Sequence, residues 1–392
     1  MKKKIKVAFF AETLKENCDG AVRTMYQIIN RIPKDQFEFL FICGDEKKVI
    51  ENLAFKTIQL PAITIPFNRN YKMALPYFVN NRLYQQLDSF QPDVVHIATP
   101  SLLGRFALYY AQQRNIPVIS IYHTHFLSYI DYYLKNTPIL IEPVKNRMVK
   151  NYRAFYDNCD LVYVPTTEMI KDLAAVGHPT NNLKLWQRGI DKQLFNPRKK
   201  DKAYLHAYTQ NNKPNILFVS RLVWEKNLDT LIDLYQLNEA KNRPYNILVA
   251  GDGIAKESLQ SQMPNAFFFG QVEHEELAIL YASSDCFFFP SITETYGNVV
   301  IEAMASGLPC VIANGGGSKS FITQGVNGFV CTPTDAAAYF EKIDSLLYDP
   351  KLYEQVVTNG LKYTQQLNWE DLVDVYFQDL RRLTNKTQLV AA

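Results

Sequence analysis

The sequence predicts an α/β protein with two doubly wound domains. Short apolar, β-rich runs alternate with helical patterns along most of the chain, which is typical of parallel sheets covered by helices. A chain of 392 residues, of which 47% are hydrophobic, can bury two cores of ordinary domain size. A polar, proline-containing stretch interrupts the periodic pattern at about 191–213. We therefore expect one sheet on each side of a linker.

Residues 1–190 contain the pattern of the first sheet. Helical patterns lie between several of its apolar runs, so the runs are expected to be parallel neighbours. After the first run, Gly20 stands where a helix is expected to begin. A glycine there lets backbone amides approach a phosphate closely, although a lone glycine is more often a simple turn. The apolar runs are 5–11, 37–43, 94–98, 117–123 and 161–165.

The most informative stretch of the second domain is 287–316, with the sequence FFFPSITETYGNVVIEAMASGLPCVIANGG. An apolar run is followed by a polar turn, a helix and a second apolar run at 309–313. Open α/β sheets bind ligands at the carboxyl ends of their strands, and a helix that starts there presents free amide groups to an anion. A phosphate is therefore expected at the start of the helix, next to Gly297, Asn298 and Val299.

Two carboxylates flank this expected phosphate. Glu294 and Glu302 are eight residues apart, so they share one helical face if the helix starts early enough. Carboxylate and phosphate repel each other, but a sugar attached to the phosphate would give the acids a function, because its hydroxyl groups can donate hydrogen bonds to them. The alternative is that both are ordinary acids that complement the helix dipole.

Two cations follow another strand of the second domain. The run NILFVS ends at Ser220, and Arg221 and Lys226 stand at the turn into the next helix. A leaving diphosphate carries charge that two fixed cations and a helix N-terminus can stabilise. As an isolated pair, the two side chains fit equally well as surface residues.

Together these motifs resemble the donor site of retaining glycosyltransferases with the two-domain GT-B fold, in the group called family 4. The spacing E-x7-E, followed by EAMASGLPCV and a glycine-rich turn, is similar to the family's signature. SRLVWEK resembles its G-R-L-x-x-x-K motif, with Ser220 in place of the usual glycine. The resemblance implies catalytic roles for His123, Arg221, Lys226 and Glu294, and donor binding by Gly20, Gly251, Asp252, Gly253, Val272, Tyr296, Gly297, Asn298, Val299 and Glu302.

The resemblance also implies roles for parts of the first domain. In the family, the loop at Gly20 closes over the donor phosphates, but that loop usually has more glycine, and here Asp19 adds a negative charge. His123 resembles the histidine that contacts the transferred sugar, with His125 beside it, although two histidines at a packed strand end would look the same. The loop 66–76 resembles that of members that glycosylate lipids, or is a solvated connector.

The implied reaction moves a sugar from a nucleotide sugar, such as a UDP- or GDP-sugar, to a hydroxyl of a lipid or glycan, with retention. The family's route is attack from the face of the leaving group, which takes up the acceptor's proton. No zinc or DxD motif and no base-activated Ser or Cys is evident, so neither metal nor cofactor is expected. A sugar-nucleotide epimerase, a non-catalytic binding protein and a nucleic-acid binder stay open as alternatives.

Charge and composition bear on the partners. Residues 1–190 hold 24 Lys and Arg against 16 Asp and Glu, an excess that suits an anionic lipid or acidic acceptor, or simply solubility. The stretch 126–156 interleaves tyrosines with basic residues, which suits a membrane surface, nucleic acid or an ordinary helix. Six scattered cysteines and the lack of a long apolar run predict a cytoplasmic protein that at most touches the inner face of a membrane, and no nucleic-acid partner is expected.

The expected domain limits follow from these patterns. Residues 1–190 form the acceptor-side domain, 191–213 the linker and 214–368 the donor domain. From Trp369 onward the spacing is helical. In the family's fold the last helix crosses back to the first domain, so 369–392 is expected to do so.

Overall fold

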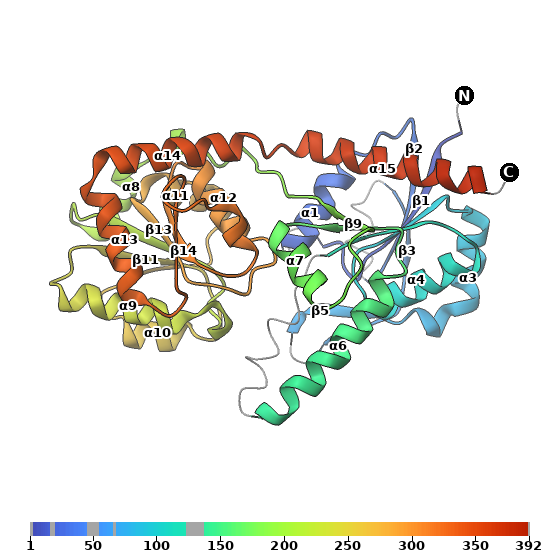
Figure 1. Ribbon diagram of the computed structural model, residues 1–392, viewed down its shortest axis with the longest axis horizontal. Coiled ribbons are helices and arrows are strands. Elements are labelled where there is room, and N and C mark those ends of the chain that lie inside the picture. The colour runs from blue at the N-terminus through green and yellow to red at the C-terminus, as the bar shows by residue number, and fades with distance from the viewer. Residues whose placement is uncertain (1–2, 16–19, 45–54, 66–67, 123–136, 391–392) are drawn as a thin grey trace. The chain divides into compact units, whose positions relative to one another are not determined.

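The computed structural model describes residues 3–15, 20–44, 55–65, 68–122 and 137–390. The chain divides into two compact units (Figure 1). The first comprises Met1–Pro165, Ile170–Arg188 and Trp369–Ala392, and the second comprises Thr166–Met169 and Gly189–Asn368. Each unit has its own parallel sheet and its own apolar core, which confirms the predicted α/β class with two doubly wound sheets.

The first unit is built on a seven-stranded parallel sheet in the order β3-β2-β1-β6-β7-β8-β9. The strand order reverses between β1 and β6, which are hydrogen-bonded neighbours. Its strands are β1 Ile5–Phe10, β2 Phe37–Cys43, β3 Lys56–Gln59, β6 Val94–Ile97, β7 Val118–Ile121, β8 Leu161–Val164 and β9 Leu183–Leu185, and the helices along this part of the chain are α1 Gly20–Ile29, α3 Asn80–Phe90, α4 Leu102–Gln113, α6 Ile141–Tyr156 and α7 Thr167–Ala175.

All five apolar runs predicted for this sheet are strands, each within about two residues of its expected limits. The loop predicted at 66–76 is wrong for most of its length. Strand β5 (Asn68–Ala74) pairs there with β4 (Ala62–Ile65) in an antiparallel ladder, while residues 66 and 67 lie outside the described part. The sequence did not predict this strand because its residues are mostly polar. The strand is defined by backbone pairing with β4, which local composition does not indicate.

The second unit is built on a six-stranded parallel sheet in the order β12-β11-β10-β13-β14-β15. The chain moves outward from β10 to β12 and then returns to place β13 on the other side of β10, so the order reverses between β10 and β13. Its strands are β10 Asn215–Val219, β11 Asn246–Ala250, β12 Phe267–Gly270, β13 Cys286–Phe289, β14 Cys310–Ala313 and β15 Phe329–Cys331, and its helices are α8 Lys202–Thr209, α9 Leu228–Ala240, α10 Lys256–Gln262, α11 His274–Ser283, α12 Asn298–Ala305, α13 Ala336–Tyr348 and α14 Pro350–Gln365.

Residues 191–213, expected as a linker, instead contribute to the second unit. Asp201 caps α8 by accepting a hydrogen bond from the Tyr204 backbone amide at 3.0 Å. Leu205, in the middle of that helix, is buried in the core of the second unit. A short helix between polar runs gives too few apolar positions for a periodic signal, which is why the sequence suggested a linker.

The last helix, α15 (Trp369–Val390), packs against the sheet of the first unit (Figure 1). Trp186 Nε1 donates to Leu372 O at 2.8 Å. Tyr163 Oη and Lys184 Nζ both donate to the buried Asp379 carboxylate, at 2.7 and 2.6 Å. Neither this helix nor any other that the structure describes has the length and apolarity needed to cross a bilayer.

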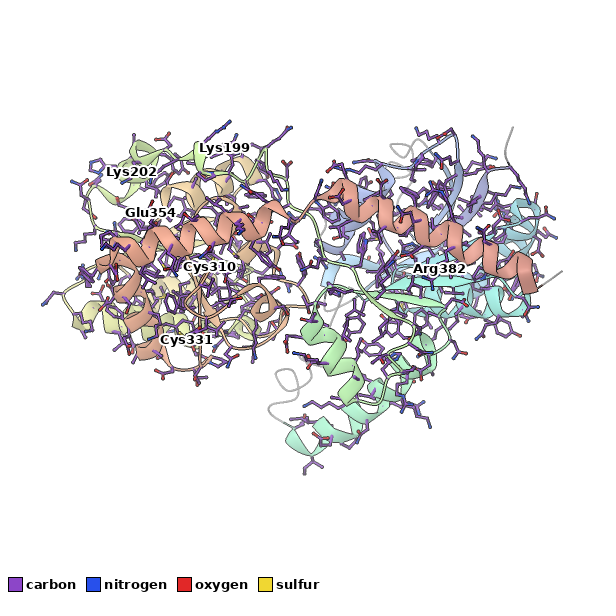
Figure 2. The ribbon with its side chains drawn as sticks, turned by 45° about the horizontal axis from the view of Figure 1, so that its top comes forward. Lys199, Lys202, Cys310, Cys331, Glu354 and Arg382 are labelled. Carbon is purple, nitrogen blue, oxygen red and sulfur yellow. The ribbon has the colours of Figure 1, made fainter. Side chains whose placement is uncertain are left out.

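The cysteines in the described part of the chain are buried free thiols (Cys43, Cys159, Cys286, Cys310 and Cys331). Figure 2 labels the last two, which belong to neighbouring strands of the second unit. Burial raises the pKa of Cys331 to about 11, so its thiol is protonated at neutral pH. Cys18 lies outside the described residues.

His96 joins β6 to α15 inside the first core. Its Nδ1 lies 2.8 Å from Tyr376 Oη, and its ring stacks on Phe9 with centroids 4.0 Å apart. Burial lowers the pKa of His96 to about 3. The unfolded chain binds a proton near pH 6.5, so the contribution of neutral His96 is fully present above about pH 6.5 and is lost as the pH falls towards 3.

We expect the free energy of unfolding to fall by about 2 kcal/mol when the pH is lowered from 7 to 5, because His96 takes up a proton in the unfolded chain but not in the folded one. The decrease is about 1.4 kcal/mol per pH unit below 6.5. Urea unfolding of the first unit at both pH values measures the loss. His96→Phe keeps a ring against Phe9 but cannot titrate, so its loss should be smaller than the wild-type loss by that amount. Equal losses in the two proteins would contradict the prediction.

Candidate active site in the second unit

The predicted cations and acids of the second unit lie at the edge of its sheet where the strand order reverses. Strand β10 ends at Val219 and β13 ends at Phe289, and the two strands are parallel neighbours. The segments that carry Arg221 and Glu294 therefore leave the sheet next to each other. In open α/β sheets, such a reversal is where ligands bind.

Lys226 and Glu294 form a partly buried ion pair at this edge. Lys226 Nζ lies 2.6 Å from Glu294 Oε1, and the side chains are 5% and 21% exposed. Lys226 Nζ also donates to Thr293 Oγ1 at 3.3 Å, and Ser291 Oγ donates to Glu294 Oε1 at 3.3 Å. Burial alone would raise the pKa of Glu294, but Lys226, with Ser291 and Arg221, outweighs burial and lowers the pKa. The carboxylate is therefore ionised at neutral pH.

Arg221 is the exposed cation of the site. Its Nη2 lies 3.4 Å from Oε1 of the buried Glu225, while its own side chain is 65% exposed. After β10 the chain makes a 3₁₀ turn at Trp224–Lys226, and Asn227 then takes a left-handed conformation with φ 58° before α9 begins. Asparagine tolerates this conformation better than most residues. The turn leaves one cation paired inside the protein and the other in contact with solvent.

The glycines of the Gly251-Asp252-Gly253 turn allow it to pack against the backbone around Arg221. A Cβ on Gly251 would lie 1.8 Å from Ser220 O, and one on Gly253 would lie 2.4 Å from Leu222 O. No side chain fits at such distances. The sequence suggested donor contacts for these glycines, and the geometry shows that they also hold the segment that carries the cations.

The side chain of Asp252 is engaged by its own turn and by the first residue of α10. Its carboxylate accepts from the Gly253 amide and from Lys256 Nζ, both at 2.7 Å. The hydrogen bond from Lys256 lowers the pKa of Asp252. Its backbone carbonyl accepts from Leu222 N at 2.9 Å, which is a second link to the neighbouring segment.

A second glycine-rich turn, after β14, supports the segment that carries Glu294. The Gly317 amide donates to Glu294 O at 2.6 Å. A Cβ on Gly316 would lie 2.6 Å from Ile292 O, and one on Gly317 would lie 2.1 Å from Thr295 O. The two segments therefore touch backbone to backbone, and side chains at these glycines would push them apart.

Helix α12 begins beside a buried hydroxyl group. Gly297 precedes the helix with φ 90°, and a Cβ on it would lie 2.0 Å from Ser318 Oγ. Ser318 is 1% exposed, and its hydroxyl has no hydrogen-bond partner among the residues that the structure describes. Amides at a helix start and a nearby hydroxyl are the donor groups that an anion such as phosphate needs.

Glu302 does not share a helical face with Glu294. Helix α12 starts only at Asn298, so Glu294 lies before the helix, in the turn. The Glu302 side chain is buried and accepts from Tyr281 Oη at 3.3 Å. The two acids predicted as a pair therefore have different surroundings, because the sequence did not reveal how late the helix begins.

Three other residues predicted to bind the donor have side chains that pack. The ring of Tyr296 is 2% exposed and meets Phe321 edge-on, with centroids 4.7 Å apart. Val299 and Val272 are half-buried against the same core, Val272 in the loop that follows β12. These contacts explain the apolar side chains without a ligand, and the predicted donor contacts stay predictions.

The structure describes only some of the first-unit residues that the sequence assigned to the site. Gly20 is the first residue of α1. Asp19, His123 and His125 lie outside the described residues, so their assigned roles stay predictions. In the part of the chain that the structure describes, no three or more His, Cys, Asp or Glu side chains are grouped so that they could hold a metal ion.

The structure adds four residues that the sequence did not single out. Glu225 stands four residues after Arg221, and that spacing was the available signal for their contact. Ser291 and Thr293 belong to the polar turn before α12 and contact the ion pair. Ser318 follows three glycines, and nothing in its local sequence indicates that it lies against Gly297.

Comparisons with known proteins cover both units. Residues 18–194 match the family described as Glycosyltransferase Family 4, and residues 202–363 match the family described as Glycosyl transferases group 1. Together the two matches account for most of the chain. The second match contains the ion pair, both glycine-rich turns and α12.

Curated relatives carry the names of sugar transferases. The chain is 33% identical to sulfoquinovosyl transferase SQD2 of Arabidopsis thaliana over 76% of its own length, but the match spans only 58% of the plant protein. It is 26% identical to a GDP-mannose-dependent alpha-mannosyltransferase of Corynebacterium glutamicum, covering 94% of this chain and 86% of the relative. It is 23% identical to alpha-monoglucosyldiacylglycerol synthase of Streptococcus pneumoniae, covering 96% and 86%.

Solved structures share the fold over nearly the whole chain. HepE of Anabaena, in complex with UDP and glucose, matches with a TM-score of 0.73 and 18% identity, covering 96% of this chain and 99% of that one. Sucrose-phosphate synthase of Thermosynechococcus elongatus matches with a TM-score of 0.75 and 20% identity, covering 98% and 100%. The GT-B fold is therefore confirmed, with its two Rossmann-like domains.

Gly297→Ala tests the close packing at the start of α12. Gly325 also has a positive φ, but a Cβ there meets nothing nearer than Phe329 Cε1 at 4.0 Å, so Gly325→Ala is a matched control. We expect the control to lose roughly 1 kcal/mol of unfolding free energy from its backbone alone. Gly297→Ala should lose at least about 1 kcal/mol more, because Ser318 must move. Equal losses in denaturant unfolding would contradict the contact with Ser318.

Proposed function

Because the chain belongs to the GT-B glycosyltransferases of the family 4 and group 1 type, we propose that it transfers a sugar from a nucleotide sugar to an acceptor hydroxyl, with retention of the anomeric configuration. The observation that carries this proposal is the Lys226–Glu294 pair, with Arg221 beside it, where the strand order of the second sheet reverses. This arrangement combines fixed cations for a phosphate with an ionised carboxylate for sugar hydroxyls.

The donor is proposed to be a UDP- or GDP-sugar. The name of one relative specifies GDP-mannose, and one structural neighbour contains UDP and glucose. In this proposal the diphosphate lies between Arg221 and the start of α12, where the Ser318 hydroxyl adds a donor. Glu294 binds hydroxyl groups of the sugar.

The acceptor is proposed to be a lipid or glycolipid hydroxyl. The support is that a relative aligned over nearly the whole of this chain is named as a synthase of monoglucosyldiacylglycerol. The electrostatics of the second unit are compatible with any hydroxyl acceptor, since the groups described there serve the donor. The acceptor class therefore has to be tested separately from the donor.

The proposed reaction proceeds on one face of the sugar. The acceptor oxygen forms a bond to the anomeric carbon as the bond to the diphosphate oxygen breaks, and the acceptor's proton passes to that departing oxygen. Arg221, Lys226 and the amides of α12 stabilise the charge that develops on the leaving group. His123 is proposed to contact the transferred sugar. Since cationic side chains carry the charge stabilisation, the reaction is proposed to need no metal ion.

Arg221→Ala should slow transfer by about two orders of magnitude with little change in thermal stability, because the side chain is mostly exposed. The donor for this assay is the nucleotide sugar that most raises the unfolding temperature. Arg243→Ala is the matched control, since it removes an exposed arginine that pairs with Glu239 at the same i,i+4 separation, near the amino end of β11. Equal kcat values in both variants and the wild type would reject the phosphate role of Arg221.

Transfer should persist in EDTA, because Arg221 and Lys226 supply the positive charge that a divalent ion supplies in metal-dependent transferases. The measurement compares initial rates in EDTA with rates in added Mg²⁺ or Mn²⁺. Retention of most of the activity is the expected result. Loss of activity in EDTA, recovered with either metal, would overturn the metal-independent mechanism.

Glu294→Gln should reduce kcat/KM less than Glu294→Ala, because the amide keeps an acceptor oxygen for sugar hydroxyls whereas alanine leaves them unpaired at roughly 1 to 3 kcal/mol each. A covalent nucleophile would not survive the change to an amide. NMR of the anomeric proton of the product gives the stereochemical outcome. An inverted product would reject retention, and a sugar trapped on Glu294 would reject same-face attack.

A further inference from the structure

Helix α6 (Ile141–Tyr156) extends away from the body of the first unit, and its amino-terminal end is the far end (Figure 1). The helix is held at its carboxyl end, where Phe155 and Tyr156 are each 2% exposed. No other residue of the helix is buried. Its amino-terminal half therefore projects without being needed for the core of its unit.

Exposed apolar side chains lie at the far end of this helix and in the 3₁₀ turn Pro138–Leu140 that leads into it. Ile139 is 89% exposed, Leu140 is 50% exposed and Val144 is 36% exposed. We call these three residues the apolar tip. Single exposed apolar residues are common, but three together at the end of a projecting helix leave apolar area that a partner could cover.

The same helix carries exposed basic side chains. Arg147, Lys150 and Arg153 follow one another at three-residue spacing, and all three are exposed. We call them the basic face. Over its whole length the helix has four basic residues and one acidic residue, Glu142, so it carries a net positive charge. Basic side chains next to exposed apolar ones are typical of helices that lie at a membrane surface.

We propose that the tip of α6 docks on an anionic lipid bilayer. The apolar tip enters the boundary between headgroups and acyl chains, and the basic face contacts lipid phosphates. A nucleic acid would account for the basic face but would leave the apolar tip in water, so the bilayer explains more of the surface. This inference goes beyond the transfer reaction and does not depend on it, although a bilayer is also where a lipid acceptor would be found.

The test uses the full chain and vesicles of phosphatidylcholine with about 30 mol% phosphatidylglycerol, compared with pure phosphatidylcholine. Co-sedimentation without donor or acceptor measures binding. Arg147→Glu with Lys150→Glu should weaken binding to the anionic vesicles at least roughly 25-fold, at about fivefold per basic residue. The control, Lys199→Glu with Lys202→Glu, reverses two exposed lysines of the second unit that Figure 2 labels, and should change binding less than about threefold.

A second pair of variants tests the apolar tip. Ile139→Asp should weaken vesicle binding roughly tenfold or more, because an apolar side chain no longer enters the bilayer. Val326→Asp is the control, since Val326 is a 44% exposed apolar residue of the second unit. All six substituted positions are exposed, so thermal unfolding should be unchanged in each of the four variants.

Three outcomes would overturn the proposal. One is the absence of binding to anionic vesicles, and another is equal binding by the α6 variants and their controls. The third is binding of a labelled single-stranded RNA that needs the basic face but not Ile139, without vesicle binding. Transfer to a detergent-solubilised acceptor is assayed in parallel. Vesicle binding without transfer would reject the proposed function alone, and transfer without vesicle binding would reject this inference alone.

Discussion

The ion pair between the buried Lys226 and the partly buried Glu294 is the constraint on which the arrangement of the site depends. A lysine that is only 5% exposed requires a partner, because an unpaired buried charge costs several kcal/mol. The partner comes from the segment after β13, whereas Lys226 comes from the segment after β10. The pair therefore fixes the two segments relative to each other at the point where the strand order reverses, so the ionised carboxylate and the exposed Arg221 lie at the same edge of the sheet.

Glycines in the neighbouring turns allow the segments that carry Lys226 and Glu294 to pack closely against those turns. Gly251 lies so close to Ser220 O that any side chain would displace the backbone next to Arg221. A side chain at Gly317 would likewise displace the backbone of the segment that carries Glu294. The Gly317 amide also donates to the Glu294 carbonyl. In each case the glycine belongs to the turn that follows the neighbouring strand of the sheet. The charged residues thus depend on glycines more than twenty residues away in sequence.

The sequence was sufficient for five of the seven strands of the first sheet and for the residues that meet at the edge of the second sheet, because apolar runs and the motifs around Arg221 and Glu294 are local signals. It failed where a contact is made at long range. The polar strand β5 is defined by its pairing with β4, and α8 is recognisable mainly because Leu205 enters a core. The late start of α12, which separates Glu294 from Glu302, depends on the left-handed Gly297 and on Ser318, which lies against it. The periodicity of the sequence indicates neither the left-handed conformation of Gly297 nor its contact with Ser318.

The charges at the site balance, and this balance bears on the proposed mechanism. Arg221 and Lys226 face Glu225 and Glu294, so the four side chains together carry no net charge. A diphosphate could not be held by surplus positive charge there, and would need the amides at the start of α12 and the Ser318 hydroxyl as well. If the phosphate draws the ammonium group of Lys226, Glu294 loses its cationic partner, and its carboxylate can then accept from a sugar hydroxyl. Donor binding would then replace the ion pair with two new contacts. Lys226 would contact the diphosphate, and Glu294 would contact the sugar.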